Sequence, residues 1–125
     1  MSPRASKKTG PKTTCRPRIR VMREGEIALG PGKVDLLEAI DTAGSISGAG
    51  RALGLSYRRA WDLVATMNAC FEEPLVAPVT GGRGGGGARL TPLGRRVLKL
   101  YRAMEQQARK AFQADWLKLR KHLKS

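Results

Sequence analysis

Apolar side chains recur at intervals of three and four residues in three successive stretches of the first half of the chain. Such spacing places them on one face of an α-helix. In the first stretch these positions are Val34, Leu37 and Ile40, which follow the Gly-Pro-Gly segment 30–32. We expect this helix to begin just after that segment and to end at Gly44, because glycine readily adopts the left-handed conformation that stops a helix.

A short second helix is predicted after Ser45, which is a good N-cap residue. Its apolar stripe consists of Ala49 and Leu53. Gly54 can take a positive φ at its end, and we expect Leu55 to fill the turn that follows.

Ser56 is a second N-cap residue, and residues 57–71 are predicted to form a third helix. The helix ends before Pro74, because proline disfavours helical geometry in the residue before it. Its inward face is formed by apolar residues at helical spacing: Ala60, Leu63, Val64, Met67 and Phe71. Two helices joined by a short glycine-containing turn define a helix-turn-helix.

Residues 75–80 and 88–90 are predicted to be two short strands around a glycine-rich loop, residues 81–87. Pro78 restricts the first strand to an edge or to a position without a ladder hydrogen bond. Such a hairpin after a helix-turn-helix is a wing. Thr91 and Pro92 then give a specific helix start, an N-cap followed by proline at the first helical position.

The last helix is predicted to run from residue 92 to about residue 123, which corresponds to about 45 Å. Such a length exceeds what one small domain can cover, so we expect its apolar stripe to pair with a second copy in a two-fold dimer. The stripe consists of Val97, Leu100, Tyr101, Met104, Ala108, Ala111 and Phe112.

Near the N-terminus, residues 18–23 alternate basic and apolar side chains, which predicts a strand that breaks near Gly25. The fold class is therefore mostly α with a small β wing, a winged helix-turn-helix with a long C-terminal dimerisation helix. We divide the chain into a disordered basic arm (1–17), a DNA-binding domain (18–91) and the dimerisation helix (92–125).

The net charge of +14 is concentrated at the two ends of the chain. The first twenty residues hold seven bases and no acid, and residues 92–125 hold ten bases and two acids, whereas the middle is nearly neutral. Charge alone fits DNA, RNA, the ribosome or an anionic membrane. The basic arm either follows phosphates or acts as a solubilising tail; its cations are Arg4, Lys7, Lys8, Lys12, Arg16, Arg18 and Arg20.

No apolar run is long enough to cross a bilayer and no secretory signal is present, so we expect a cytoplasmic protein without a membrane partner. Cys15 and Cys70 are expected to be free thiols in a reducing compartment.

The first turn of the third helix carries the candidate DNA-contacting residues Ser56, Tyr57, Arg58 and Arg59, and we add Arg51 of the preceding helix. Arginine pairs with O6 and N7 of guanine in the major groove, so these four first-turn residues are expected to set the sequence preference. The alternative for Arg58 is a simple ion pair with Asp62 one turn later. Trp61 fits either core packing or a base contact.

Residues 82–87 contain a formal GxGxxG motif. Nucleotide binding would require a helix directly after it, whereas here a strand follows. We therefore expect Arg83 and the surrounding glycine backbone to approach phosphates or the minor groove. The alternative is a loop without a binding role.

Catalysis finds no support in the sequence, since His122 is the only histidine and no nucleophile motif or metal-ligand cluster is present. We expect no enzyme, no metal and no cofactor. The cations of the last helix are expected to form its solvated face: Arg95, Arg96, Lys99 and Arg102.

Several segments resemble the N-terminal domain of the molybdate-responsive transcription regulators, the ModE family. They are residues 44–47, the SYRRAWD run 56–62, Met67-Asn68 and the glycine-rich segment 81–91, with Gly94 and Tyr101. The resemblance covers about residues 18–115. It implies a winged helix like that of LysR-type regulators, and a homodimer on a palindromic operator upstream of molybdenum-related genes.

Regulators of this family carry a molybdate-binding region after the DNA-binding domain, for which 125 residues leave no room. We therefore expect this chain to lack its own molybdate-binding domain, and to be either a stand-alone variant or the partner of a separate molybdate-sensing protein. Two alternatives stay open: a basic RNA-binding or nucleoid-associated protein without sequence preference, and a small molybdate-binding protein.

Overall fold

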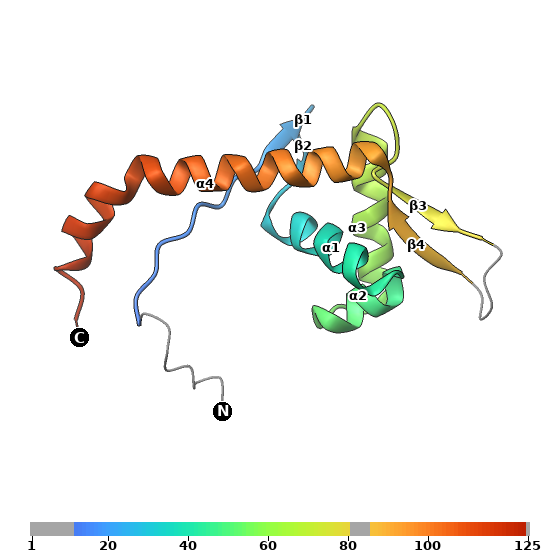
Figure 1. Cartoon of the computed structure of the whole chain (residues 1–125), viewed down its shortest axis with the longest axis horizontal. Helices are drawn as coiled ribbons and strands as arrows, with labels where there is room; N and C mark the ends of the chain where they lie inside the picture. The colour runs from blue at the N-terminus through green and yellow to red at the C-terminus, as the bar shows by residue number, and fades with distance from the viewer. Residues whose placement is uncertain (1–11, 81–85, 125) are drawn as a thin grey trace.

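A computed structural model of the protein describes residues 12–80 and 86–124. Three short helices pack beneath one half of a long helix, while a β-hairpin projects beyond them on one side (Figure 1). The elements in chain order are β1 (Val21–Arg23), β2 (Glu26–Leu29), α1 (Pro31–Ala43), α2 (Ile46–Ala52), α3 (Tyr57–Cys70), β3 (Val76–Val79), β4 (Gly87–Leu90) and α4 (Pro92–Arg120). The predicted fold class, mostly helical with a small β wing and a long last helix, is confirmed.

The hydrophobic core forms around α1, which contacts α2, α3 and α4. Leu36 of α1 is fully buried although the predicted stripe omits it, because α1 is covered on more than one side. The predicted inward face of α3 is confirmed, with Ala60, Val64 and Met67 buried and the other two members half-buried. Leu53 is a wrong assignment: α2 ends at Ala52, so Leu53 leaves the stripe and is 40% exposed.

The predicted helix starts are confirmed by their hydrogen bonds. The Oγ atom of Ser45 accepts from the Gly48 N–H at 2.9 Å, and that of Ser56 accepts from the Arg59 N–H at 3.0 Å. Thr91 does the same for α4, with Pro92 as the first helical residue. Pro31 also occupies the first turn of α1, so that helix begins inside the Gly-Pro-Gly segment rather than after it.

The N-terminal strand is shorter than predicted, and it pairs with a strand that was not expected. Only Val21–Arg23 of the predicted range 18–23 is a strand, and it forms an antiparallel hairpin with β2. Glu24 and Gly25 both have positive φ, 50° and 80°, as in the two-residue turns that suit hairpins. Glutamate is not among the residues that typically form this turn. Exposed and buried residues do not alternate along β2, so the sequence pattern predicts neither the turn nor the strand.

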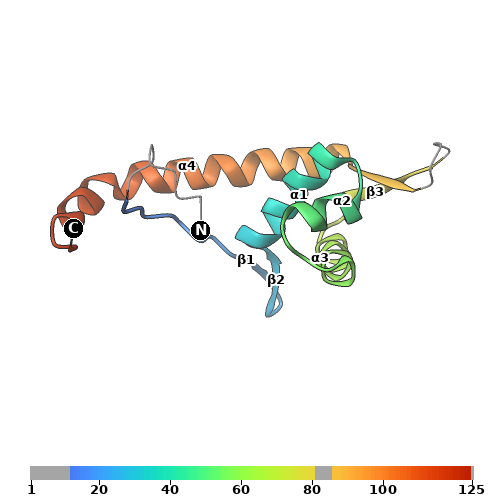
Figure 2. The ribbon, with the colours of Figure 1, turned by 90° about the horizontal axis from the view of Figure 1, so that it is seen from below.

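The wing consists of β3 and β4, paired antiparallel from Val76↔Leu90 to Val79↔Gly87. Figure 2 shows it extending away from the helical body. The backbone N–H of Ala88 donates to the Gly44 carbonyl at 2.9 Å, which fastens the wing to the end of α1. The tip of the wing, residues 81–85, lies outside the described residues.

Helix α4 has 29 residues, corresponding to about 44 Å, and extends well beyond the helical body (Figures 1 and 2). It ends at Arg120, three residues before the predicted end. Tyr101 is buried in the core, whereas Leu100 and Met104 of the predicted stripe are 58% and 42% exposed. No helix in the described ranges is both long and apolar enough to cross a membrane.

Candidate nucleic-acid interface

The angle between α2 and α3 is set by a close approach at Gly50. A Cβ atom built on Gly50 would lie 3.2 Å from the Ala60 Cβ and 3.4 Å from the Leu55 carbonyl oxygen, so a larger side chain would push the helices apart. The Leu55 N–H also donates to the Gly50 carbonyl at 2.8 Å. Gly54, at φ 73°, completes the turn. The predicted helix-turn-helix is thus confirmed, with Leu55 half-buried against the core.

The first turn of α3 is exposed and presents three side chains to solvent. Tyr57 is 58% exposed, the Arg58 side chain is 87% exposed, and Arg59 is also exposed. Ser56 uses its oxygen lone pair as the helix cap, which leaves its hydroxyl hydrogen free to donate. Arg51 lies in the last turn of α2, separated from this group in the chain by the turn, and its side chain is exposed.

Arg58 does form the ion pair with Asp62 that was the alternative to a DNA contact. The Arg58 Nε and Asp62 Oδ2 atoms are 3.7 Å apart, and both side chains are largely exposed. Such an exposed i,i+4 pair contributes about 0.2–0.5 kcal/mol. A contact of that strength is too weak to keep Arg58 from binding a phosphate or a base instead. The ion pair with Asp62 and a role in DNA binding are therefore compatible.

A cleft of about 410 Å³, which we call the wing-side cleft, separates α3 from the wing. Tyr57 and Trp61 line it from α3, and Pro78 lines it from β3. Trp61 is 48% exposed, so it is not a core residue of this chain. Its indole is therefore free to contact a partner molecule in the wing-side cleft.

Asn68 joins the wing to α3 and was missed as a functional candidate. Its Oδ1 atom accepts from the backbone N–H groups of Leu75 and Val76 at 2.8 and 3.2 Å, and its Nδ2 donates to the Val76 carbonyl at 3.1 Å. Three hydrogen bonds thus fix where β3 begins relative to α3. A polar residue beside the buried Met67 was the available signal.

Some predicted cations lie outside the described residues. These are Arg83 of the wing tip and Arg4, Lys7 and Lys8 of the arm. Within the described part of the arm, Lys12, Arg16, Arg18 and Arg20 are exposed. Arg89 on β4 is exposed between two buried neighbours, Ala88 and Leu90, so it lies on the outer face of the wing.

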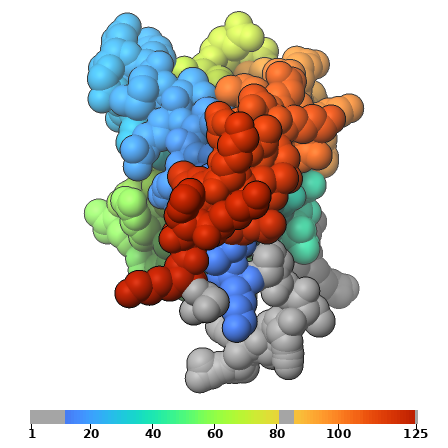
Figure 3. Space-filling model, turned by 90° about the vertical axis from the view of Figure 1, so that its left-hand side faces the viewer, coloured from blue at the N-terminus to red at the C-terminus, as the bar shows by residue number. Residues whose placement is uncertain are grey.

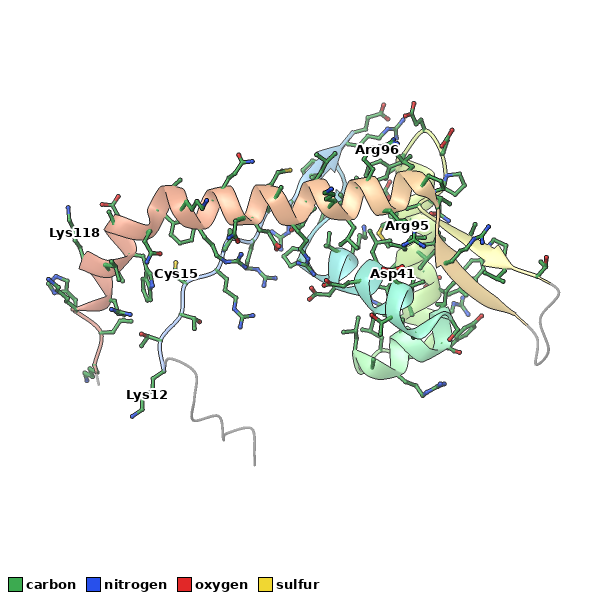
Figure 4. All side chains as sticks on the ribbon, in the orientation of Figure 1. Lys12, Cys15, Asp41, Arg95, Arg96 and Lys118 are labelled. Carbon is green, nitrogen blue, oxygen red and sulfur yellow. The ribbon has the colours of Figure 1, made fainter. Side chains whose placement is uncertain are left out.

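Helix α4 crosses α1, and the expectation that its cations form a solvated face holds for Arg95, Arg96 and Lys99, which are exposed, but is wrong for Arg102, which is half-buried. Arg102 forms ion pairs with Asp35 at 3.1 Å, with Glu105 at 2.9 Å and with Glu38. Arg95 pairs with Asp41 at 3.0 Å, and Figure 4 shows the two side chains meeting between the helices. A helical period cannot reveal such pairs, because it does not show which neighbour a face meets.

Burial and charge both act on the Tyr101–Arg102 segment. Burial raises the pKa of the Tyr101 hydroxyl above its ordinary value, and the nearby Glu105 carboxylate adds to the effect. Burial acts to lower the pKa of Arg102, but the hydrogen bonds that its guanidinium donates to Glu105, Glu38 and Asp35 outweigh burial and raise that pKa. Arg102 is therefore a permanent cation that three carboxylates of α1 and α4 share as an ion-pair partner.

Within residues 12–80 and 86–124, no three His, Cys, Asp or Glu side chains gather as a group that could hold a metal ion. Cys15 and Cys70 are free thiols, the first exposed and the second half-buried.

The helix-turn-helix, the wing and the long last helix together define a winged-helix fold of the LysR type. The chain is similar to the full-length LysR-type regulator LysG from Corynebacterium glutamicum, solved with bound effector Arg. The match has a TM-score of 0.52 and 25% identity, and covers 71% of this chain and 29% of that one.

Over most of the winged-helix region the chain is also a homologue of the ModE and MopA proteins, which confirms the resemblance inferred from its sequence. It is 51% identical over 78 residues to the molybdenum transport protein ModE of Azotobacter vinelandii (62% of this chain, 29% of the relative). It is 45% identical over 82 residues to the DNA-binding transcriptional dual regulator ModE of Escherichia coli K12 (66% and 31%). The molybdenum-pterin-binding protein MopA of Rhodobacter capsulatus is 43% identical over 93 residues (74% and 35%).

The chain thus spans about a third of the length of these curated relatives. No family model matches it.

Proposed function

We propose that the chain is a cytoplasmic transcription regulator that binds double-stranded DNA with sequence preference and acts on molybdenum-related genes. The observation that carries the proposal is the exposed first turn of α3, held on a helix-turn-helix with a wing beside it. The name of the Escherichia coli relative, a DNA-binding transcriptional dual regulator, supports it. The name of the Azotobacter relative, a molybdenum transport protein, supports the link to molybdenum.

In this proposal α3 enters the major groove with its first turn. Tyr57 and Arg58 contact base edges, because their side chains are exposed and extend beyond the backbone of the helix. Ser56 donates its hydroxyl hydrogen to a phosphate oxygen, and Arg51 and Arg59 contact the backbone or bases on either side. Arg83 at the wing tip adds affinity without sequence preference.

We further propose that two copies pair along α4. Leu100 and Met104 of α4 support this, because both apolar side chains stay exposed within one copy although their neighbour Tyr101 is buried. The other half of α4 extends beyond the helical body and offers further length for pairing (Figure 1). A two-fold dimer would place two copies of α3 in successive major grooves about 34–36 Å apart, so the target would be a palindromic operator.

Selection of duplexes from a random-sequence library tests the main proposal. We expect an enriched palindrome that binds about 10³-fold more tightly than bulk DNA of the same length. A structured RNA serves as the second competitor. Equal binding to the selected duplex, bulk DNA and RNA would instead establish the alternative, a basic RNA-binding or nucleoid-associated protein.

The sensing of molybdate by a separate protein is the last part of the proposal. It predicts that molybdate alone changes neither the affinity of the purified chain for its duplex nor the heat signal in calorimetry. A measurable oxyanion affinity of the chain itself would contradict it.

A further inference from the structure

A second cleft, of about 570 Å³, lies between α3 and the start of α1. We call it the basic cleft. It meets α3 at Arg59 and Thr66, whereas the wing-side cleft meets α3 at Trp61 and Asn68. At 100° per residue these two pairs lie on opposite faces of the helix. Arg58 lies between the two faces and points away from the core, so the two clefts flank the exposed edge of α3.

The basic cleft carries more cations than its own acids neutralise. Four cationic residues line it: Arg18, Arg20, Lys33 and Arg59. Its two acidic residues are already paired, Asp35 with Arg102 at 3.1 Å and Asp62 with Arg58 at 3.7 Å. Lys33 donates to the backbone carbonyl of Ile27.

Across the described ranges, 12–80 and 86–124, no carboxylate lies within 4.0 Å of the guanidinium of Arg18, Arg20 or Arg59. These three arginines therefore line the cleft without an anionic partner in this part of the chain.

The arm is held in place where it enters the basic cleft. Ile19 is half-buried against the core, and its carbonyl accepts a hydrogen bond from the Tyr101 hydroxyl at 2.6 Å. Arg18 and Arg20 flank Ile19, and in extended backbone such neighbours point away from it. Both line the cleft. Figure 3 shows this N-terminal segment lying beside α4.

We propose that the basic cleft binds a backbone phosphate of the DNA, on the strand across the major groove from the wing. The inference rests on the proposed function and assigns Arg59 to phosphate binding rather than to base recognition. Guanidinium groups bind phosphate through two parallel hydrogen bonds, and three arginines without a carboxylate partner line this one cleft. A phosphate contact on each side of α3 would fix the orientation of the helix in the groove.

The test compares two variants with the same change in net charge. The cleft variant carries Arg18→Gln, Arg20→Gln and Arg59→Gln. The control carries Arg109→Gln, Lys110→Gln and Lys121→Gln, in the projecting half of α4 and at its C-cap, on other faces of the helix than Leu100 and Met104. All six residues are exposed, so the unfolding midpoints should match that of the wild type.

Fluorescence anisotropy with the selected duplex then gives the dissociation constant as a function of salt concentration. For the cleft variant we expect about tenfold weaker binding or more, a log–log salt slope smaller by about 1, and an unchanged preference for the selected duplex over bulk DNA. The control should keep the wild-type slope. A cleft variant with the wild-type slope would overturn the inference while leaving the proposed function standing.

Single methylphosphonate substitutions along both strands locate the contact. We expect at least one position where loss of the phosphate charge weakens binding by the wild type but not by the cleft variant. Absence of such a position overturns the inference. A wild type that prefers no duplex contradicts the proposed function instead.

Inorganic phosphate, titrated at constant ionic strength, separates a DNA contact from a site for free anions. Tight binding of inorganic phosphate that is lost in the cleft variant, together with an unchanged salt slope, would assign the cleft to a free oxyanion and overturn the inference.

Discussion

The hydroxyl of Tyr101 donates a hydrogen bond to the backbone carbonyl of Ile19 across 2.6 Å, between residues 82 positions apart in the chain. Tyr101 is 1% exposed, so its side chain lies in the core, and its hydroxyl fixes the backbone at Ile19 to α4. The chain is therefore part of the folded unit from Ile19 onward, and Arg18 and Arg20 on either side of Ile19 line the basic cleft beside α3.

Tyr101→Phe removes this hydrogen bond while keeping the ring in the core. We expect the free energy of unfolding to fall by about 1 kcal/mol at neutral pH, because the Ile19 carbonyl loses its partner. The wild type should also lose stability as the pH rises above 10, since burial raises the pKa of Tyr101 and the unfolded chain ionises first.

Urea unfolding of both proteins between pH 7 and 11 measures this, and the difference between wild type and variant should shrink as the pH rises. A difference that is independent of pH would contradict the assigned pKa direction.

Arg102 holds three carboxylates between α1 and α4, so Arg102→Met should be destabilising. We expect a loss of about 2 kcal/mol, below the value for a fully buried pair because Arg102 is one-third exposed. Glu105→Gln provides a control, because its effect on the free energy of unfolding should have opposite signs in the wild type and in the Arg102→Met variant. It should destabilise the wild type, and it should restore stability to the Arg102→Met variant by removing an uncompensated buried charge. Destabilisation in both backgrounds would show that Glu105 acts through another contact.

Gly94 is the point where α4 touches the chain leading into the wing. A Cβ atom built there would lie 2.1 Å from the Leu75 carbonyl oxygen, which is backbone and cannot move aside. We expect Gly94→Ala to cost about 3 kcal/mol and to lower the unfolding midpoint. Gly32→Ala in α1 is the matched control, since no atom lies within 4 Å of its Cβ position. It should be neutral or stabilising by up to about 1 kcal/mol.

Arg58→Ala tests base recognition by α3. If Arg58 pairs with guanine, the substitution should cost about 1–3 kcal/mol on the selected duplex and much less on bulk DNA. Anisotropy titrations on both DNAs provide the comparison. An equal loss on the two would place Arg58 on phosphate instead.

The α4 pairing is tested by Leu100→Glu with Met104→Glu. Both side chains are exposed within one copy, so the fold of the monomer should be unaffected, whereas two charges at the proposed interface should dissociate the dimer. Sedimentation velocity should then show a monomer with an unchanged circular dichroism spectrum. A dimer that persists would remove α4 from the interface.

Much of the fold could be predicted from local chemistry. Ser45, Ser56 and Thr91 cap helices where their residue type predicts it, and Gly44 and Gly54 adopt the positive φ that their positions require. These interactions span only a few residues along the chain, so a single sequence contains them. The Glu24–Gly25 hairpin escaped prediction because glutamate at positive φ is set by strand pairing and not by its own preference.

The candidate interface was harder to predict than the scaffold. The exposed first turn of α3 follows from a helical wheel, and Arg58 and Arg59 lie on the surface as expected. The basic cleft cannot be predicted from a helical wheel, because it is lined by Arg20, Lys33 and Arg59 from three separate segments of the chain. The Asn68 contacts with β3 and the Arg102 ion pairs have the same character, since each depends on which elements become neighbours in space.

A single residue, Thr91, separates the last strand of the wing from a helix of 29 residues. The Thr91 N–H donates to the Leu75 carbonyl and its hydroxyl donates to the Pro74 carbonyl, so this one-residue connection is fixed to the chain that leads into β3. A change in the tilt of α4 should therefore move the β3–β4 hairpin with it as one rigid unit. In a dimer, the crossing angle of the two α4 helices would set the distance between the two wings, and with it the half-site spacing that the dimer can bind.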